Sequence, residues 1–386
     1  MKKTIIPYFD EKGVKFENKF SNTSFMSFVP SGMERISYRK PKTNDRTKKG
    51  MVISMKKIKV AQIGTSKWSH GSGIWSTMVK HPEAFELVGF ALPENEREKF
   101  PDSIKCFEGY REMTVEEILS DPEIEAVCVE TEEIYLTKYA SLVAKAGKHL
   151  HMEKPGGVCL RDFEELIGIL KEKELVFSLG YMYRFNPKIN EAIERVRRGE
   201  IGAVSCVEAQ MSCRHGKELR DWLKAFPGGM MFFLGCHLID LIYRIQGEPE
   251  RIIPLNCSSG FDGVSGDDIG MTVFKYPNGV SFIKTASCES GGYERRRLLI
   301  SGECGTFEIR PLEGYAPGGE QYTTLYECFG KEWTVPEKET TSEPFGRYDG
   351  MMMNFAEMVQ GKKNPYTYDY ELELYKLVLR ACGMEA

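Results

Sequence analysis

The sequence predicts an α/β protein in which a domain built on a parallel sheet is followed by a second α/β domain with an open, mostly antiparallel sheet. The chain has 386 residues, a length that suits two or three domains. Strand-like and helix-like segments alternate up to about residue 180, the pattern of βαβ units. After about residue 203 the segments become rich in strands joined by tight turns. We therefore expect one domain over 55–180 and another over 181–386.

The first half opens with a buried-type strand, KIKVAQIG (57–64), that ends in glycine. Apolar runs of strand length recur at 85–92 and 125–130, and the short strand HLHM leads into the charged turn EKP. Pro155 lacks an amide donor and pushes Lys154 toward an extended conformation. Ligands of α/β sheets bind at the carboxyl ends of strands, so this turn is a candidate site. The alternative is a surface turn with an accidental ion pair, which would have the same sequence pattern. Helices are expected around 74–81, 115–121 and 137–146.

The second half continues with a helix over 160–175, whose apolar residues recur at helical spacing, and a strand over 176–181. The next helix begins at Pro187 and stops at Gly199. The Pro-Asn-Gly of YPNGV indicates a hairpin. The last helix is a candidate to pack back on the first domain. β-rich segments are expected over 204–213, 271–287 and 296–311, and helices over 346–361 and 371–383.

Composition describes an ordinary globular chain, with 41% hydrophobic and 28% charged residues. A net charge of −4 gives no sign of nucleic-acid binding, and no apolar run is long enough to span a membrane. Residues 1–54 carry twelve Lys/Arg against five Asp/Glu and have no useful period, so we predict a disordered extension, with Met55 as an alternative start. A basic tail that binds an acidic partner is the other interpretation. Eleven cysteines without C-x-x-C pairs suit buried thiols in the cytoplasm.

The loop after the first strand has part of a dinucleotide-binding fingerprint, which needs glycines for a tight turn and close approach to a pyrophosphate. Gly64 fits the first glycine, but Ser66 stands at the second position, and only Gly71 or Gly73 could serve as the third. After the second strand, Leu92 stands where a ribose-binding acid is usual. Hydroxyl recognition then shifts to Glu94, or Arg97 meets the 2′-phosphate of NADP; the sequence leans slightly to NAD.

Four segments in this order, GKHLHMEKP, LGYMYRFNP, RRGEIGAV and GGMMFFLGCHLIDL, resemble the Gfo/Idh/MocA family (glucose–fructose oxidoreductase, inositol dehydrogenase and MocA). The resemblance covers roughly 56–383. It implies a Rossmann domain followed by an α/β domain with an open, largely antiparallel sheet. It also implies NAD(P)-dependent oxidation or reduction of sugars, cyclitols and related polyols.

The resemblance implies site residues one by one. Lys154 matches a lysine that contacts the nicotinamide region and the reacting hydroxyl, where an ammonium stabilises alkoxide character. Pro155 fixes that turn and Glu153 orients the lysine. His237 matches the general acid/base, a role that suits its near-neutral pKa, although a histidine in an apolar stretch is often only packed. Asp240, three residues on, could orient the imidazole. The implied cofactor contacts are Gly64, Thr65, Ser66, Leu92, Glu94, Thr131, Glu132, Glu153, Lys154 and Pro155, and the implied substrate contacts are Tyr183, Arg184, Asn186, Trp222 and His237.

Two departures affect the expected chemistry. The family commonly has an aspartate four residues before the histidine, where this chain has Phe233, and Thr131-Glu132-Glu133 replaces the usual Thr-Pro-Asn. Lys154 and His237 could act alone, Asp221 or Glu218 could replace the missing carboxylate, or redox chemistry could be lost. His149 and His151 share a strand face but have no third ligand nearby, so we expect no metal.

The leading hypothesis is an NAD(P)-dependent oxidoreductase acting on a ring hydroxyl or ketone of a sugar, glycoside or cyclitol. Tyr181, Tyr183 and Trp222 suit stacking on a sugar face. One alternative is a relative that retains NAD and cleaves glycosidic bonds. Another is a non-catalytic dinucleotide-binding or sensor protein. The open sheet of the second domain suggests a homodimer or homotetramer.

Overall fold

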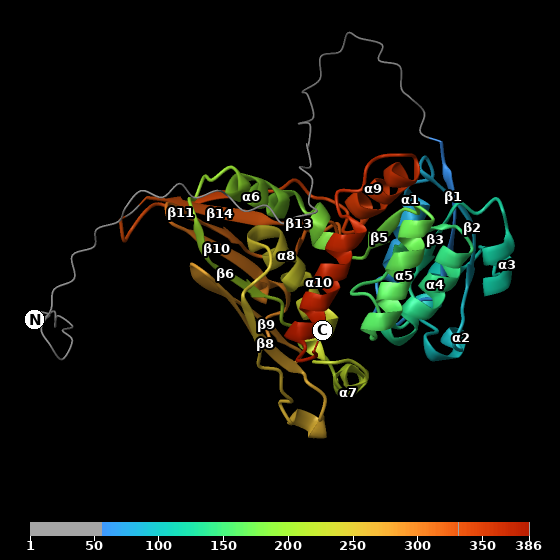
Figure 1. Cartoon of the computed structure of the whole chain (residues 1–386), viewed down its shortest axis with the longest axis horizontal. Coiled ribbons are helices and arrows are strands. Elements are labelled where there is room, and N and C mark those ends of the chain that lie inside the picture. Colours follow the sequence, from blue (N-terminus) through green and yellow to red (C-terminus); the bar gives the residue numbers. More distant parts are fainter. Residues whose placement is uncertain (1–55, 331, 386) are drawn as a thin grey trace, which may run out of the picture.

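The computed structural model of the chain describes residues 56–330 and 332–385, so the predicted extension over 1–54 lies outside the described residues. Two sheets organise the described chain, a five-stranded parallel sheet near the N-terminal end and an eight-stranded, mostly antiparallel sheet after it (Figure 1). The predicted fold class is therefore confirmed.

The parallel sheet has the strand order β2-β1-β3-β4-β5, so the order reverses between β1 and β3. In α/β sheets this switch point opens a crevice at the carboxyl ends of the strands, where ligands bind. The register aligns those ends, with Ile63 beside Val129 and Val129 beside Met152. The strands are β1 (Ile58–Ile63), β2 (Phe85–Ala91), β3 (Ala126–Val129), β4 (His149–Met152) and β5 (Phe177–Leu179).

Helices cover this sheet close to where apolar periodicity predicts them. In the helix expected over 160–175, Phe163, Leu166, Ile167 and Leu170 are buried. The short helix expected over 115–121 has Thr114 as its N-cap, and the Thr114 hydroxyl forms a capping box with Glu117. The helices are α1 (Gly71–Lys80), α2 (Glu96–Lys99), α3 (Val115–Ser120), α4 (Leu136–Lys145) and α5 (Leu160–Glu172).

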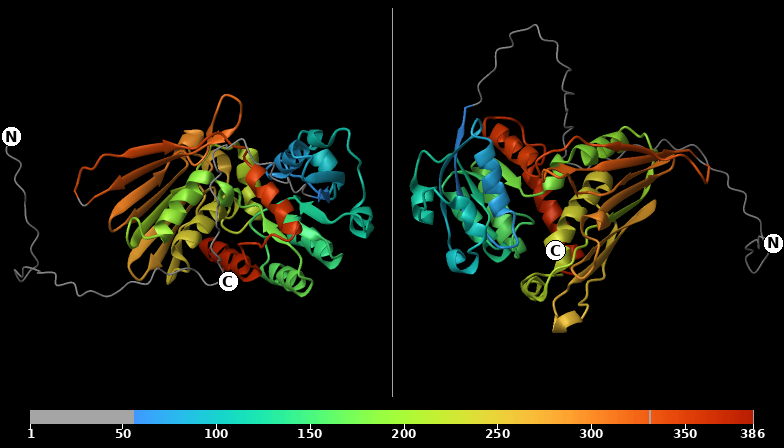
Figure 2. Two further views of the ribbon diagram at one scale, coloured as in Figure 1. Left: turned by 90° about the horizontal axis from the view of Figure 1, so that it is seen from above. Right: turned by 180° about the vertical axis from the view of Figure 1, so that it is seen from behind.

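The second sheet has the order β15-β14-β11-β10-β6-β9-β8-β7, and every neighbouring pair is antiparallel except β6 and β9. Figure 2 shows helices on one face of this sheet only. The strands β7, β14 and β15 were not predicted. The strands are β6 (Val204–Gln210), β7 (Arg251–Pro254), β8 (Ile269–Tyr276), β9 (Gly279–Ala286), β10 (Arg297–Gly302), β11 (Gly305–Ile309), β14 (Thr324–Phe329) and β15 (Lys338–Thr341), and a separate pair is β12 (Gly314–Tyr315) with β13 (Gln321–Tyr322).

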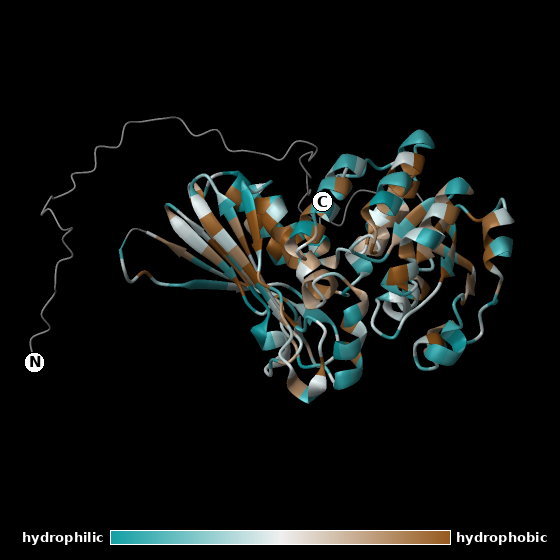
Figure 3. Ribbon diagram, turned by 60° about the horizontal axis from the view of Figure 1, so that its bottom comes forward, coloured by the Kyte–Doolittle hydropathy of each residue, from teal (hydrophilic) through white to brown (hydrophobic). Residues whose placement is uncertain are grey.

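Helix α10 joins the two halves of the molecule. The Tyr375 ring lies 4.6 Å from the Phe163 ring on α5, and the Tyr370 ring lies 4.9 Å from the Tyr243 ring on α8. The hydrophobic residues, brown in Figure 3, gather where helices meet the sheets. In the described chain no helix is long and apolar enough to cross a membrane. The helices that follow β5 in the chain are α6 (Pro187–Arg197), α7 (Lys217–Trp222), α8 (Cys236–Gln246), α9 (Asp349–Val359) and α10 (Tyr368–Ala381).

Candidate active site

The loop between β1 and α1 contains the tight turn expected of a dinucleotide site. Gly64 has φ = +84°, and a Cβ there would lie 2.3 Å from Thr131 Cγ2, so only glycine fits. Gly71 is the first residue of α1, and a Cβ on it would lie 3.0 Å from Glu130 Cβ. Gly71 therefore allows the close helix–strand packing that the third glycine of the fingerprint provides.

The serines of this loop bind its own backbone amides. Ser69 N donates to Ser66 Oγ at 2.9 Å, and Ser66 N donates to Ser69 Oγ at 3.0 Å. Thr65 N donates to Glu96 Oε2 at 3.1 Å, and burial raises the pKa of Glu96 to about 9. A pyrophosphate would therefore compete with hydroxyls and a protonated carboxyl for amides that are free in the glycine-rich version of the loop.

The residues after β2, which are the candidates to contact the ribose of a dinucleotide, are already paired with neighbouring side chains. Glu94 accepts hydrogen bonds from Lys138 and, at 2.7 Å, from Tyr139. Arg97, the candidate partner of a 2′-phosphate, pairs with Glu112. Leu92 is half-buried and offers no acceptor to a ribose. The turn at Gly64 and the buried Thr65 Oγ1, which has no hydrogen-bond partner among the described residues, fit a dinucleotide at this edge. Glu94, the acid expected to bind the ribose, is already bound by Lys138 and Tyr139.

Lys154 is the central cation of the site and is 1% exposed. Its Nζ donates to the backbone oxygen of Phe233 at 3.0 Å, lies 3.4 Å from Glu153 Oε1, and stands 4.6 Å from the centre of the Phe233 ring. Burial alone would lower the pKa of Lys154, but its acidic neighbours, Glu153 first, raise it. The ammonium is therefore charged and joins the β4 turn to the second domain.

His237 is the second residue of α8, directly after a π-helical turn over Met231–Gly235, and lies close enough to Lys154 to interact with it electrostatically. Such turns often occur at functional sites. Both ring nitrogens are buried and lack a hydrogen-bond partner in the described chain. Burial, followed by the charge of Lys154, lowers the pKa of His237 well below its usual value. The imidazole is therefore neutral and can accept a proton. The rings of Tyr183, Tyr181 and His70 lie 5.5, 5.7 and 6.0 Å from it.

His70 was not predicted as a site residue. Its backbone N donates to Glu153 Oε2 at 3.1 Å, and its Nδ1 lies 3.2 Å from the same oxygen. Burial alone would raise the pKa of Glu153, but His70 and Lys154 hold it below its usual range. Glu153 therefore ties the loop before α1 to the EKP turn. A histidine inside the glycine loop was the only sequence signal for this role.

Two further buried carboxyls follow β3. Glu130 comes directly after the strand, and Glu133 begins the helical turn after it. Glu130 and Glu133 are 0% exposed, and their side-chain oxygens have no hydrogen-bond partner in the described chain. Burial raises the pKa of Glu130 well above its usual value. For Glu133, burial raises the pKa to about 7, although the charge of Lys154 opposes the shift. Sequence reasoning noted Glu133 only as a departure from the family pattern.

We expected Asp240 to orient the imidazole of His237, but the Asp240 carboxylate binds other residues. Its Oδ1 accepts from Arg184 Nη2 at 2.9 Å and from Tyr370 OH at 3.2 Å. Arg184 is 2% exposed and also donates to Glu371 at 2.6 and 2.9 Å. Arg184 is thus held inside a buried ion cluster between α8 and α10 instead of facing a substrate. The prediction that Asp240 and His237 lie on one helix is confirmed, but the Asp240 carboxylate binds Arg184, which is far from it in the sequence.

Asn186 also has a structural position. Its Oδ1 accepts from the amides of Lys188 and Ile189 and so caps α6, while its Nδ2 donates to Thr323 Oγ1 at 2.8 Å. Tyr183 is buried beside His237. The ring of Trp222 lies 5.4 Å from the Phe233 ring, and its Nε1 donates to Glu132 Oε1 at 3.3 Å.

The two carboxylates suggested as replacements for the missing aspartate lie on α7 and pair with surface lysines. Asp221 binds Lys217 and Lys224, and Glu218 lies 2.6 Å from Lys67. The Glu218 side chain is 70% exposed. Neither is buried against Lys154, whereas Glu133 is.

The two histidines of β4 bind other groups. His149 Nδ1 accepts from Val176 N at 3.0 Å, and His151 Nδ1 lies 3.2 Å from Ser178 Oγ. Within residues 56–330 and 332–385, no group of three or more His, Cys, Asp or Glu side chains could hold a metal ion.

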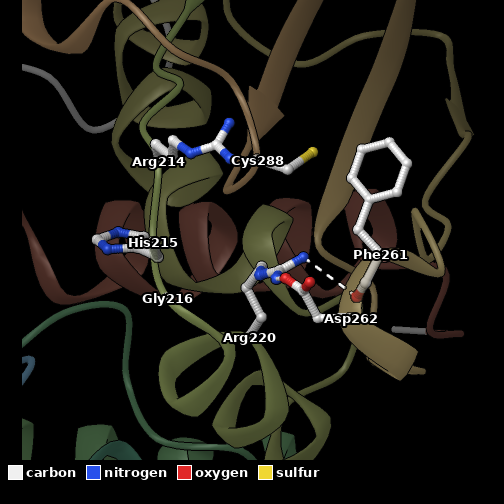
Figure 4. Close-up of a pocket in the computed structure, with 7 residues that line it drawn as sticks. All are labelled: Arg214, His215, Gly216, Arg220, Phe261, Asp262 and Cys288. Atoms are coloured by element: carbon white, nitrogen blue, oxygen red, sulfur yellow. Dashed lines mark hydrogen bonds and ion pairs between the residues drawn. The ribbon is translucent and has the colours of Figure 1, made fainter.

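A cavity of about 620 Å³ is lined by residues of the second domain. His215, whose ring lies 6.5 Å from the Phe233 ring, lines it together with Arg214 and Arg220 (Figure 4). Arg220 pairs with Asp262 and Asp268, so its charge is compensated. Phe233 therefore neighbours both Lys154 and His215, and His215 lines a cavity large enough for a sugar-sized ligand.

Two family models match the chain. The model described as "Oxidoreductase family, NAD-binding Rossmann fold" matches residues 58–181, and the GFO/IDH/MocA C-terminal domain matches residues 189–308. They cover the parallel sheet and most of the second domain.

Relatives and solved structures agree with these matches. Trans-1,2-dihydrobenzene-1,2-diol dehydrogenase of Bos taurus is 25% identical over 56% of this chain and 66% of its own length, just under two thirds. The scyllo-inositol 2-dehydrogenase (NAD(+)) of Bacillus subtilis is 25% identical over 66% of this chain and 73% of its own length. The crystal structure of aldose-aldose oxidoreductase from Caulobacter crescentus has a TM-score of 0.70 at 21% identity, over 85% of this chain and 98% of its own. The last similarity shows the fold.

Proposed function

We propose that this chain, which belongs to the Gfo/Idh/MocA oxidoreductase family with its NAD-binding Rossmann domain, transfers hydride between nicotinamide and a ring hydroxyl or ketone of a sugar, glycoside or cyclitol. The observation that carries the proposal is that Lys154 and His237 lie close enough for the charge of Lys154 to lower the pKa of His237. Lys154 Nζ donates to Phe233 O in the turn that leads into His237. The names of the relatives that act on a diol and on an inositol support this substrate class.

The two residues have complementary roles in oxidation. The nicotinamide ring, when bound, supplies the acceptor for the hydride that leaves the ring carbon. His237, neutral because it is buried beside a cation, accepts the hydroxyl proton. The ammonium of Lys154 stabilises the negative charge that develops on the oxygen. In the reverse direction His237 returns the proton to the new alkoxide.

We assign to Glu133 the part of the carboxylate that is absent at position 233. It is fully buried, neither oxygen has a hydrogen-bond partner among the residues that the structure describes, and it interacts electrostatically with Lys154. Its pKa of about 7 lets it ionise near neutral pH and balance the ammonium. It acts through Lys154 and is therefore a positioning residue.

A second candidate function is dinucleotide binding without turnover. The observation that favours it is the loop whose amides are already bound by Ser66, Ser69 and Glu96. A protein of this kind would bind dinucleotide but show no nicotinamide absorbance change with any sugar or polyol.

Turnover is the direct test of the proposal. The full chain is mixed with NAD⁺ or NADP⁺ and a panel of sugars, glycosides and cyclitols, and with the reduced cofactors and the matching ketones. We expect an absorbance change with one cofactor pair. Dinucleotide released by denaturing the protein, together with bond cleavage and no net reduction, would favour the NAD-retaining glycoside-cleaving alternative.

We also propose a domain boundary near residue 180, a cytoplasmic location, and a homodimer or homotetramer formed through the second sheet. The eleven cysteines are all free, which supports a reducing compartment. The sheet face without a helix supports the assembly (Figure 2). A monomer by light scattering would contradict the proposed oligomer.

A further inference from the structure

The second-domain wall of the site has more positive than negative charge. Arg296 and Arg347 both bind one carboxylate, that of Glu313, which is 0% exposed. Arg347 Nη2 donates to Glu313 Oε1 at 3.0 Å, and Arg296 Nη1 donates to Oε2. Burial alone would raise the pKa of Glu313, but the two arginines lower it, so it is ionised. Among the described residues, two guanidinium groups thus share one carboxylate, and this cluster carries one net positive charge.

This charge lies next to the proposed proton acceptor. The Tyr183 ring, 5.5 Å from the His237 ring, lies close enough to Glu313 that the two side chains interact. On the other side, the guanidinium of Arg347 stands 5.4 Å from the Tyr348 ring, which lies 5.3 Å from the His70 ring. After burial and Lys154, Arg347 is among the charges that lower the pKa of His237.

The arginines also have unused donors. Arg296 is 8% exposed, and its Nε is buried with no hydrogen-bond partner in the described chain. Arg347 uses Nε toward Met182 Sδ and Nη2 toward Glu313, while no residue of 56–330 or 332–385 accepts from Nη1. Its side chain is 25% exposed, so a ligand can reach it. An uncompensated charge in such a place is costly unless a bound anion balances it.

We propose that the substrate carries a negatively charged group, a carboxylate or a phosphate ester on its ring, and that Arg347 binds this group beside His237. The inference rests on the proposed hydride transfer and narrows the substrate to acidic sugars or cyclitols. Arginine suits both groups because its planar fork makes two parallel N–H···O hydrogen bonds. Arg296 holds the shared Glu313 and keeps the wall positive. Arg214, which donates a hydrogen bond to Ser290 at 3.3 Å, adds a cation on the adjoining cavity (Figure 4).

Matched substrate sets test the proposal in the full chain. Glucose is compared with glucuronate and glucose 6-phosphate, and galactose with galacturonate and galactose 6-phosphate, by kcat/KM. We expect an anionic member to exceed its neutral partner by about tenfold or more, with a preference that weakens as salt rises. The carboxylate and phosphate arms tell which group the site takes.

The variant Arg347→Gln should lower kcat/KM for the anionic substrate on the order of 100-fold, and kcat/KM for the neutral partner by a much smaller factor. Arg310→Gln is the matched control, because Arg310 is an exposed arginine that pairs with Glu308 and Glu337 far along the second sheet. Arg347→Lys should recover part of the loss, since it restores the charge without the fork.

Two results would overturn the inference. If neutral members are turned over equally or better and Arg347→Gln leaves that preference unchanged, the anionic substrate is wrong while hydride transfer stands. If no member turns over, calorimetry with glucuronate and glucose 6-phosphate decides. Anion binding that Arg347→Gln abolishes would support the anion site at Arg347. No anion binding to the wild-type chain would contradict this site.

Discussion

The two walls of the site differ in how they compensate charge. At the edge of the parallel sheet, Glu130, Glu133 and Glu153 surround one cation, Lys154, and burial shifts the surplus carboxyls toward their protonated forms. On the second-domain wall, Arg296 and Arg347 share one anion, Glu313. Carboxyls can take up protons when buried, but arginine stays charged. The acidic wall can therefore balance itself by protonation, whereas the basic wall needs an anion from outside.

The strongest way to break this comparison is to remove the cation of the acidic wall. Lys154→Met should lower kcat/KM by about 10²–10³ or more, because it removes a donor that acts on developing negative charge. Dinucleotide affinity measured by calorimetry should change much less. Lys145→Met, on an exposed face of α4, is the matched control. Unchanged kcat/KM would show that Lys154 only packs.

The buried ion cluster around Arg184 tests whether this charge stabilises the fold or binds the substrate. Arg184→Met leaves Asp240 and Glu371 buried without their cation, so the free energy of unfolding should fall by about 3–5 kcal/mol. Denaturant titration measures it. If stability is unchanged but KM for the sugar rises, Arg184 faces the substrate after all, as the resemblance implied.

Glu133 provides a test based on pH. Its pKa is raised from the usual value to about 7, so its protonated form favours the fold at low pH and this contribution disappears as pH rises through 7. Relative to Glu133→Gln, the wild type should lose about 3 kcal/mol of stability between pH 4.5 and 7. Chemical unfolding of both proteins across this range measures the difference.

The same variant tests the assigned role. Wild-type kcat should rise as Glu133 ionises near pH 7, and Glu133→Gln should lack this step. The control Glu123→Gln removes an exposed carboxylate that pairs with Lys59. In the double variant with Phe233→Asp, a carboxylate returns at the family position and should recover activity. Equal pH profiles for wild type and Glu133→Gln would remove the role.

The smallest expected effect concerns the glycine loop. Ser66→Gly frees the amides of Trp68 and Ser69, which now donate to Ser66 Oγ at 3.2 and 2.9 Å. Dinucleotide should bind tighter by roughly two- to tenfold, the scale of one net hydrogen bond. Ser120→Ala on exposed α3 is the control. Weaker binding would mean that the serine hydroxyl itself contacts the phosphates.

Local patterns in the sequence predicted the regular elements well but not the partners of charged side chains. Strands β1 to β5 follow from apolar runs of strand length, and helices such as α5 follow from apolar periodicity. The strands β7 and β15, of four residues each, carry charged or proline residues and lack such a period. Asp240 was correctly placed on the helix of His237, yet Arg184, 56 positions away, binds it. Glu133 and His70 gain their properties from burial and from neighbours on other strands, which spacing along the chain does not encode.

The central claim is that a dinucleotide binds at the carboxyl edge of the parallel sheet despite Ser66 and Leu92. Calorimetric titration of the full chain with NAD⁺, NADH, NADP⁺ and NADPH tests it most directly. We expect clear binding of one oxidised and reduced pair, or a tightly held dinucleotide that denaturation releases. No binding by purified protein, together with no dinucleotide released on denaturation, would contradict the claim.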